Sequence, residues 1–101
     1  MPRYVLLATL TPEGMKTVKE RPHRIQEVNK EIEAFGAKVV EQYAVLGPYD
    51  FVTILEAPDN NAAAKVSIEL NSRGTIKIMS MPATPTEEFV TNLKKTKWPK
   101  K

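Results

Sequence analysis

Few side chains in this sequence could carry acid–base chemistry. His23 is the single histidine, and histidine is the side-chain type that titrates near neutrality. It lies in the stretch "RPHR", between Arg21 and Arg24, at the predicted start of a helical segment. Such a group could receive an anionic ligand at the helix start. The alternative is a solvent-exposed histidine in a polar turn.

A second candidate site is the stretch "GPYD" at residues 47–50. Tyr49 and Asp50 are polar side chains at the start of a predicted strand, a position that is typical of polar groups in pockets. The same residues suit a tight corner, because Gly47 and Pro48 are turn formers and the Asp50 carboxylate can accept the turn's own amides. Composition favours the corner, with Tyr49 as the residue that has a possible ligand role.

The sequence predicts neither a metal site nor a cofactor. Zinc needs three or four convergent ligands, whereas the chain has one histidine and no cysteine. The four glycines are isolated, so the sequence has no phosphate-binding loop. A haem would depend on His23, which stands next to Pro22 in a poor position for an axial ligand.

Composition is that of one globular domain. The chain has 101 residues, of which 42% are hydrophobic and 27% are charged. Its apolar runs are far shorter than the roughly 20 residues that span a bilayer, and its start has no signal-peptide pattern. Together with the lack of cysteine, these features predict a cytoplasmic protein without membrane contact.

The net charge of +3 comes from the end of the chain. Removing the charges of the five C-terminal lysines leaves the rest at −2, and these lysines are Lys94, Lys95, Lys97, Lys100 and Lys101. Phosphate binding requires basic residues clustered on one groove-facing element, so the sequence argues against nucleic acid as a partner. We expect a single domain over residues 1–95 and a solvated basic tail over residues 96–101.

Four stretches rich in β-branched and aromatic residues predict strands. They cover residues 3–10, 37–46, 50–57 and 75–81. Pro82 is expected to stop the last of them.

Between and after the strands, apolar residues recur at steps of three or four, which predicts helices. These periods cover residues 12–35, 62–73 and 84–95. Pro22 interrupts the first period as a kink or a restart, and Gly36 and Gly74 end the first two. Thr11 is the expected cap of the first helix, and Asp59, Asn60 and Asn61 compete to cap the second.

The last helix is predicted to start with a capping box. Thr84 and Glu87 have the required spacing. Its apolar residues Phe89, Val90 and Leu93 are expected to be buried.

This order of elements, β-α-β-β-α-β plus a terminal helix, predicts an α+β, ferredoxin-like fold. Its four-stranded antiparallel sheet should carry both main helices on one face, with the first and third strands at its centre.

The two central strands lack the alternation of a sheet with one face in water. Val5 and Leu7 are as apolar as their neighbours on the opposite face, and the same is true of Val52 and Ile54. The second face must be covered either by the C-terminal helix or by a second copy of the sheet. We expect a homodimer or higher homo-oligomer, with Tyr4 and Tyr43 lining the space between sheets.

The stretch "GPYDFVTILEAPD" resembles the signature of the GYD-domain family, with Gly47, Tyr49 and Asp50 as the matching residues. The segments "LTPEG" and "RPHR", a glycine before the last strand and "TEEF" after it also agree, so the resemblance covers residues 3–93. It implies a dimeric α/β barrel of two ferredoxin-like sheets packed face to face, and no assigned activity. The wider superfamily contains cofactor-free oxygenases, lactone isomerases, haem enzymes and effector-binding domains, so the fold does not choose between functions.

Two functions fit the sequence. The first is a small-ligand-binding or oligomeric interaction module without catalysis, whose pocket between sheet and helices lies near Tyr49, Asp50 and His23, with Arg24 and Tyr43 as further lining candidates. The second is a cofactor-independent oxygenase or isomerase that acts on a small apolar or aromatic substrate, with His23 or Asp50 as general base. The small number of titratable groups favours the first.

Overall fold

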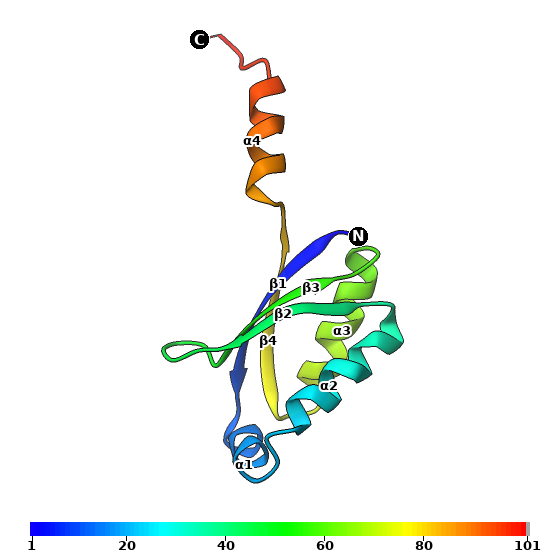
Figure 1. Cartoon of the computed structure of the whole chain (residues 1–101), viewed down its shortest axis with the longest axis vertical. Helices are drawn as coiled ribbons and strands as arrows, with labels where there is room; N and C mark the ends of the chain where they lie inside the picture. Colours follow the sequence, from blue (N-terminus) through cyan, green and yellow to red (C-terminus); the bar gives the residue numbers. More distant parts are fainter. Residues whose placement is uncertain (101) are drawn as a thin grey trace.

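The centre of the molecule is a four-stranded antiparallel sheet (Figure 1). The computed structural model describes residues 1–100, so Lys101, the last lysine of the predicted basic tail, lies outside the described residues. The strands are β1 (Arg3–Leu10), β2 (Lys38–Ala44), β3 (Phe51–Glu56) and β4 (Ile76–Ala83). Their order in the sheet is β2-β3-β1-β4, which confirms that the first and third strands are central.

Helices follow the predicted periods. They are α1 (Pro12–Glu20), α2 (Arg24–Ile32), α3 (Asn60–Ser72) and α4 (Thr86–Lys95), with a 3-10 turn at Glu33–Phe35. Pro22 lies between α1 and α2, so the interrupted period is a restart and not a kink. Among residues 1–100, none of these helices combines the length and the apolar character needed to cross a membrane.

The helix ends use the expected signals. The Thr11 side chain caps α1 by accepting the Gly14 N–H at 3.2 Å. Of the three candidates for the cap of α3, Asp59 is the N-cap, and its side chain accepts the Ala62 N–H at 2.8 Å. Gly36 and Gly74 have φ of 76° and 77°, the left-handed conformation that glycine adopts without steric cost.

Helices α2 and α3 cover one face of the sheet. The core joins alternate residues of the central strands to the inner sides of the helices, and its largest fully buried side chains are Leu55 and Val66. Tyr4 belongs to this core with 3% exposure, and its hydroxyl donates to the Asn60 side chain at 2.6 Å. The prediction that Tyr4 lines a space between sheets is therefore wrong, because its position in β1 points it toward the helices.

Helix α1 is held close to the start of β4. The Thr11 N–H donates to the Thr75 carbonyl at 3.0 Å, and the Thr11 hydroxyl donates to the Gly74 carbonyl at 2.8 Å. A Cβ atom on Gly14 would lie only 1.9 Å from the Thr75 carbonyl oxygen. The absence of a side chain at Gly14 is what allows this approach.

Gly14→Ala is therefore expected to destabilise the fold by about 1–3 kcal/mol, the usual cost of overpacking. Helix propensity alone predicts the opposite sign, since alanine is favoured over glycine in a helix by up to about 1 kcal/mol. Urea unfolding measures the difference, with Lys16→Ala at an exposed site of the same helix as the control. A more stable Gly14→Ala protein would contradict the close approach.

Within residues 1–100, no helix lies over the second face of the sheet (Figure 1). We call this surface the open sheet face; its side chains include Val5, Leu7, Val52, Ile54, Tyr43, Met79 and Met81. Met79 and Met81 are 51% and 40% exposed, and the four aliphatic side chains are half-buried by one another.

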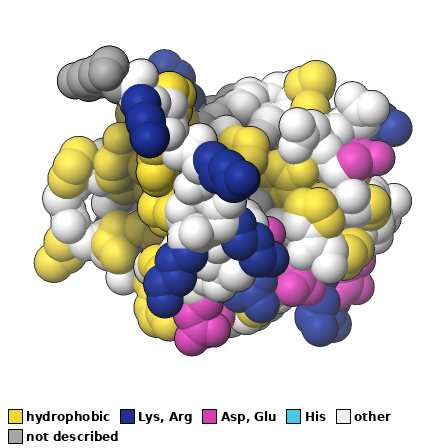
Figure 2. All heavy atoms as spheres, turned by 90° about the horizontal axis from the view of Figure 1, so that it is seen from above, with side chains coloured by type: hydrophobic (Ala, Val, Ile, Leu, Met, Phe, Trp, Pro, Cys, Tyr) yellow, Lys and Arg dark blue, Asp and Glu magenta, His cyan; other side chains and the backbone are white. Residues whose placement is uncertain are grey.

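Helix α4 extends away from the sheet along the 58 Å long axis of the molecule (Figure 1). Phe89, Val90 and Leu93 are exposed, so their predicted burial is wrong for the single chain: within the described residues, α4 buries none of its side chains. Figure 2, which looks down on α4 from above, shows apolar side chains at the surface with lysines and arginines among them. The C-terminal helix thus leaves the open sheet face uncovered.

The boundary between β4 and α4 also differs from expectation. Strand β4 continues through Pro82 to Ala83, which an edge strand tolerates because a missing N–H on its outer side breaks no ladder. Pro85 is extended, with ψ of 138°, so α4 begins at Thr86 without a side-chain cap. The predicted capping box of Thr84 and Glu87 is therefore not formed.

Candidate functional site

A cavity of about 390 Å³ lies between the covered face of the sheet and helices α1, α2 and α3. Most of its lining is apolar, as in typical small-molecule sites. The apolar lining comprises Leu6, Ala8, Leu10, Val18, Ile25, Val28, Ile32, Phe51, Leu70, Ile76 and Ile78.

A chain of side-chain hydrogen bonds forms one polar part of the lining. The Asn29 amide of α2 donates to the Gln42 carbonyl oxygen at 2.7 Å, and the Gln42 amide donates to the Thr53 hydroxyl at 3.1 Å. Thr53 is 4% exposed and stands on the inner face of β3 between Phe51 and Leu55. A hydroxyl that accepts one hydrogen bond can still donate another, so Thr53 can donate a hydrogen bond to an acceptor atom in the cavity.

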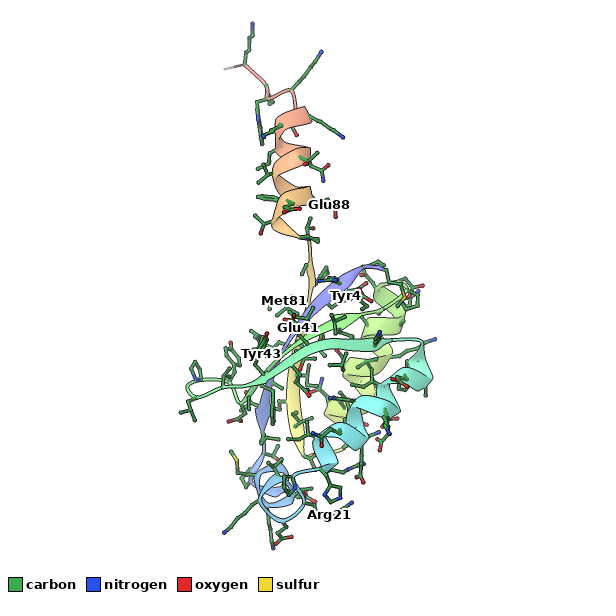
Figure 3. The ribbon with its side chains drawn as sticks, viewed as in Figure 1. Tyr4, Arg21, Glu41, Tyr43, Met81 and Glu88 are labelled. Carbon is green, nitrogen blue, oxygen red and sulfur yellow. The ribbon has the colours of Figure 1, made fainter. Side chains whose placement is uncertain are left out.

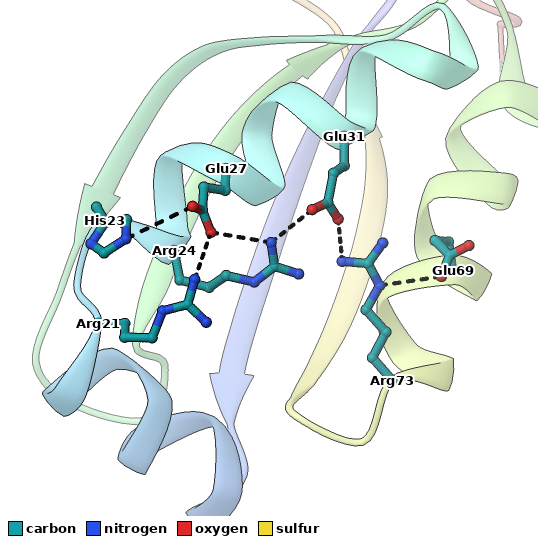
Figure 4. A network of polar contacts seen from close by, with 7 residues as sticks. All are labelled: Arg21, His23, Arg24, Glu27, Glu31, Glu69 and Arg73. Carbon is teal, nitrogen blue, oxygen red and sulfur yellow. Dashed lines mark hydrogen bonds and ion pairs between the residues drawn. The ribbon is translucent and has the colours of Figure 1, made fainter.

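The other polar part is cationic. Arg21, Arg24 and Arg73 line the cavity, and no aspartate or glutamate among the described residues lines it. Arg24 and Arg73 both pair with Glu31, at 2.7 and 2.6 Å (Figure 4). This network holds α2 to α3 at one edge of the cavity.

The outer part of the network adds two more glutamates. Arg21 and Arg24 lie 3.3 and 3.4 Å from Glu27, and Arg73 lies 3.2 Å from Glu69 (Figure 4). Each of these pairs is partly exposed to solvent, which limits its contribution to stability.

The ion pairs also change the acidity of their members. The hydrogen bond from Arg24, followed by that from Arg73, lowers the pKa of Glu31. The hydrogen bond with Glu31 is the main cause that raises the pKa of Arg24.

Acid is therefore expected to remove the contribution of Glu31 to stability. Because its pKa is lowered by folding, the gain is fully present above the ordinary glutamate value of about 4.3 and is lost as the pH falls through the folded-state value. Glu31→Gln lacks the charge at every pH, so the two proteins should differ in free energy of unfolding at neutral pH and converge in acid. Urea unfolding across this pH range measures the difference. A gap that stays constant down to the lowest pH would show that the Glu31 charge is not responsible.

The predicted site residues lie in three separate places. Arg24 lines the cavity, while His23 is exposed at the start of α2, with its Nε2 3.8 Å from the Glu27 carboxylate.

Tyr43 lies on the open sheet face, and its hydroxyl donates to the Glu41 carboxylate at 3.0 Å, which raises the pKa of Tyr43. Figure 3 shows Tyr43 on the sheet, well apart from the end of α1. Tyr49 and Asp50 lie in the loop between β2 and β3.

Asp50 joins this loop to the end of β1. Its carboxylate accepts the Leu10 N–H at 2.8 Å, and its own N–H donates to the Ala8 carbonyl at 2.8 Å. Its carbonyl accepts the Val45 N–H at 2.9 Å, which closes the loop. The expectation that the carboxylate bonds the turn's own amides is wrong: it satisfies an amide of β1, 40 residues away.

Asp50→Ala is expected to lower the free energy of unfolding by about 1–3 kcal/mol, because it leaves the Leu10 N–H without its charged acceptor. Asp50→Asn keeps an acceptor oxygen and should cost less. Tyr49→Phe keeps the ring and should leave stability nearly unchanged. Thermal unfolding of the three variants tests this order. Equal losses for Asn and Ala would contradict a role for the side-chain oxygen.

Sequence reasoning missed several polar residues of the cavity. Gln42 and Arg73 lie in different elements, and no local motif connects them. Thr53 did carry a signal, since it is a polar residue at an inward position of a central strand whose neighbours at that face are apolar. Among residues 1–100 no group of three or more histidine, aspartate or glutamate side chains is placed to hold a metal ion.

Known proteins resemble the chain in sequence and in fold. The family described as "GYD domain" matches residues 4–93. A protein of Thermus thermophilus, "Glutamine synthetase and cystathionine beta-lyase binding protein", is 47% identical over 95 residues, which are 93% of this chain and 100% of that protein.

Two solved structures show the same α+β fold. The crystal structure of TTHA0845 from Thermus thermophilus has a TM-score of 0.53 and 23% identity, and covers 84% of this chain and 95% of its own. Another crystal structure has a TM-score of 0.58 and 16% identity, and covers 83% of this chain and 100% of its own. At these identities the likeness concerns the fold alone.

Proposed function

Because the chain belongs to the GYD-domain family, we propose that it is a non-catalytic binding module that works as a homodimer and docks onto other proteins. The observation that carries this proposal is the large apolar surface that one chain leaves exposed: the open sheet face and the apolar side of α4. Soluble monomers rarely expose contiguous apolar patches of this kind, and such patches mark interaction sites.

The open sheet face is the proposed contact between two copies. Val5, Leu7, Val52 and Ile54 form its centre, and a second identical sheet would cover them as the helices cover the opposite face. The two methionines on β4 add adaptable side chains. The finer fold that we propose is a pair of ferredoxin-like protomers closed into a dimeric α/β barrel.

Helix α4 is proposed to lie on the partner subunit. Its exposed Phe89, Val90 and Leu93 follow helical spacing and so share one side. Trp98, 67% exposed in one chain, would approach the partner with them. An apolar helix that projects from its own domain gains little from folding there, whereas it gains burial on a second copy.

The loop between β2 and β3 is the proposed contact with other proteins. It projects from the sheet (Figure 1), and its residue Leu46, next to Gly47, is fully exposed. Tyr49 follows in the same loop, and tyrosine is enriched in protein interfaces. The relative's name supports enzymes such as glutamine synthetase and cystathionine β-lyase as the kind of partner.

The enzyme alternative has less support. A cofactor-independent oxygenase or isomerase would need a general base beside its bound substrate. Neither His23 nor Asp50 lines the cavity, and the Asp50 carboxylate is already bonded to Leu10.

Light scattering at micromolar concentration tests the dimer, with twice the 11.4 kDa chain mass as the expected result. Calorimetric titration with purified glutamine synthetase and cystathionine β-lyase, taken from the organism that produces this protein, tests docking. Leu46→Asp should weaken this docking, while Ile68→Asp, at an exposed aliphatic residue on α3, should not. A monomer refutes the self-contact, and no heat with either enzyme refutes these partners.

A further inference from the structure

We infer that the cavity between the sheet and helices α1, α2 and α3 binds a small apolar carboxylate, held at its charged end by Arg24 and Arg73. This ligand site goes beyond the proposed docking onto proteins and does not rest on it. Each can fail without the other.

The size and lining of the cavity fit an apolar molecule. Its volume of about 390 Å³ falls within the range of small-ligand sites, roughly 300–1,000 Å³. Ala8 is the smallest apolar side chain of the lining and lies between the longer side chains of Leu6 and Leu10 along the same strand face. Apolar space of this size in a folded domain costs stability when it is empty, and a bound apolar ligand offsets that cost.

The charge of the lining selects an anion. Three arginines contribute to the wall, and no carboxylate among residues 1–100 does. The carboxylate partners of these arginines, shown in Figure 4, are not among the residues that line the cavity. Guanidinium groups form charge-assisted hydrogen bonds with a carboxylate, which a neutral ligand cannot form.

Donors remain available for such a ligand. A guanidinium has five N–H donors in a fork. In the described part of the chain, the ion pairs of Arg24 use Nη1 and those of Arg73 use Nη1 and Nε. The Nη2 group of each arginine is therefore left for a further acceptor.

The Glu31 carboxylate of the same chain would compete with a ligand carboxylate for Arg24 and Arg73. Its two carboxylate oxygens bridge Arg24 and Arg73 at 2.7 and 2.6 Å, the arrangement that a ligand carboxylate would take. Removing this charge should take one anionic partner from each arginine, while Glu27 and Glu69 keep their pairs, and should strengthen ligand binding. Removing either arginine should weaken it. Opposite signs from neighbouring residues are hard to obtain from a purely structural network.

Thr53 offers a second polar contact, to the part of the ligand away from its carboxylate. Its buried hydroxyl accepts from Gln42 and can donate to a carbonyl or hydroxyl oxygen inside the cavity. Acids with an apolar chain or ring therefore define the class, with room for one further oxygen atom.

Calorimetric titration of the full chain with 4-phenylbutyrate tests the inference, with 4-phenylbutan-1-ol as the matched neutral probe. The acid should bind at least about tenfold more tightly than the alcohol, the ratio expected from one charge-assisted hydrogen bond. Arg24→Met and Arg73→Met should each weaken the acid about tenfold and leave the alcohol unchanged. Glu31→Gln should tighten the acid several-fold.

Two controls locate the binding. Arg3→Met removes an arginine that pairs with Glu56 at 3.5 Å outside the cavity, and should have no effect. Ala8→Leu fills the cavity and should abolish binding of both probes; if that variant does not fold, Val28→Phe fills the same space from α2.

The inference is overturned if the acid does not bind or binds no better than the alcohol. It is equally overturned if Arg3→Met weakens the acid as much as Arg24→Met does, or if binding survives when the cavity is filled.

Discussion

Leu7→Glu is expected to turn the proposed dimer into a folded monomer, with a rise in the dimer dissociation constant of at least about 100-fold. Leu7 lies at the centre of the open sheet face, paired with Val52 on one side and Met79 on the other. A carboxylate there stays in water in the single chain but is buried without a partner when two sheets meet. Two such charges enter each dimer, which doubles the penalty.

Sedimentation over a range of concentrations measures this effect, and circular dichroism shows whether the monomer is folded. The matched control is Ile68→Glu, since Ile68 is 69% exposed on α3, away from the open sheet face. If Leu7→Glu associates as tightly as wild type, the sheet faces do not form the contact.

Leu55→Ala is expected to lower the free energy of unfolding by about 2–5 kcal/mol. Leu55 is fully buried in β3 and packs in the core with Val66 of α3 and Ile32 of α2. Its truncation loses apolar burial and leaves a void that rigid strands on both sides cannot close.

Urea unfolding measures the loss, and Leu46→Ala provides the same chemical change at a fully exposed position. The control should stay within about 0.5 kcal/mol of wild type. A small effect at Leu55 would mean that the covered face of the sheet is loosely packed.

Signals that act within a few residues predicted the elements well. Thr11 and Asp59 cap helices because their side chains reach amides three residues ahead, and Gly36 and Gly74 end helices through their own backbone freedom. Such contacts depend on local sequence alone, so they can be recognised without knowing the fold.

Predictions that depended on distant partners were less successful. The period of Phe89, Val90 and Leu93 predicts a helix with one apolar side, and α4 has one. The period cannot specify what that side packs on, because the same pattern serves a contact within the chain or with a second copy. Asp50 is similar: its type suits a turn, but its acceptor role depends on where the end of β1 lies.

The cavity was the least predictable feature. Arg24 was singled out for its charge next to His23, and it does line the cavity. Arg73, at the end of α3, and Gln42, in β2, come from other elements and reach the cavity only through the tertiary fold. Nothing in their local sequence distinguishes them from ordinary surface residues.

The central position of β1 has a consequence for how the chain folds. β1 precedes the other three strands along the chain, yet its Arg3 pairs with Glu56 on one side and with Ala83 on the other. The sheet therefore cannot close until β4 has left the ribosome, and each pairing closes a long loop. Such non-local topology slows folding relative to helical bundles of equal size. Until then the apolar strand β1 has unpaired edges, which makes this the stage of folding at which the chain is most prone to aggregate.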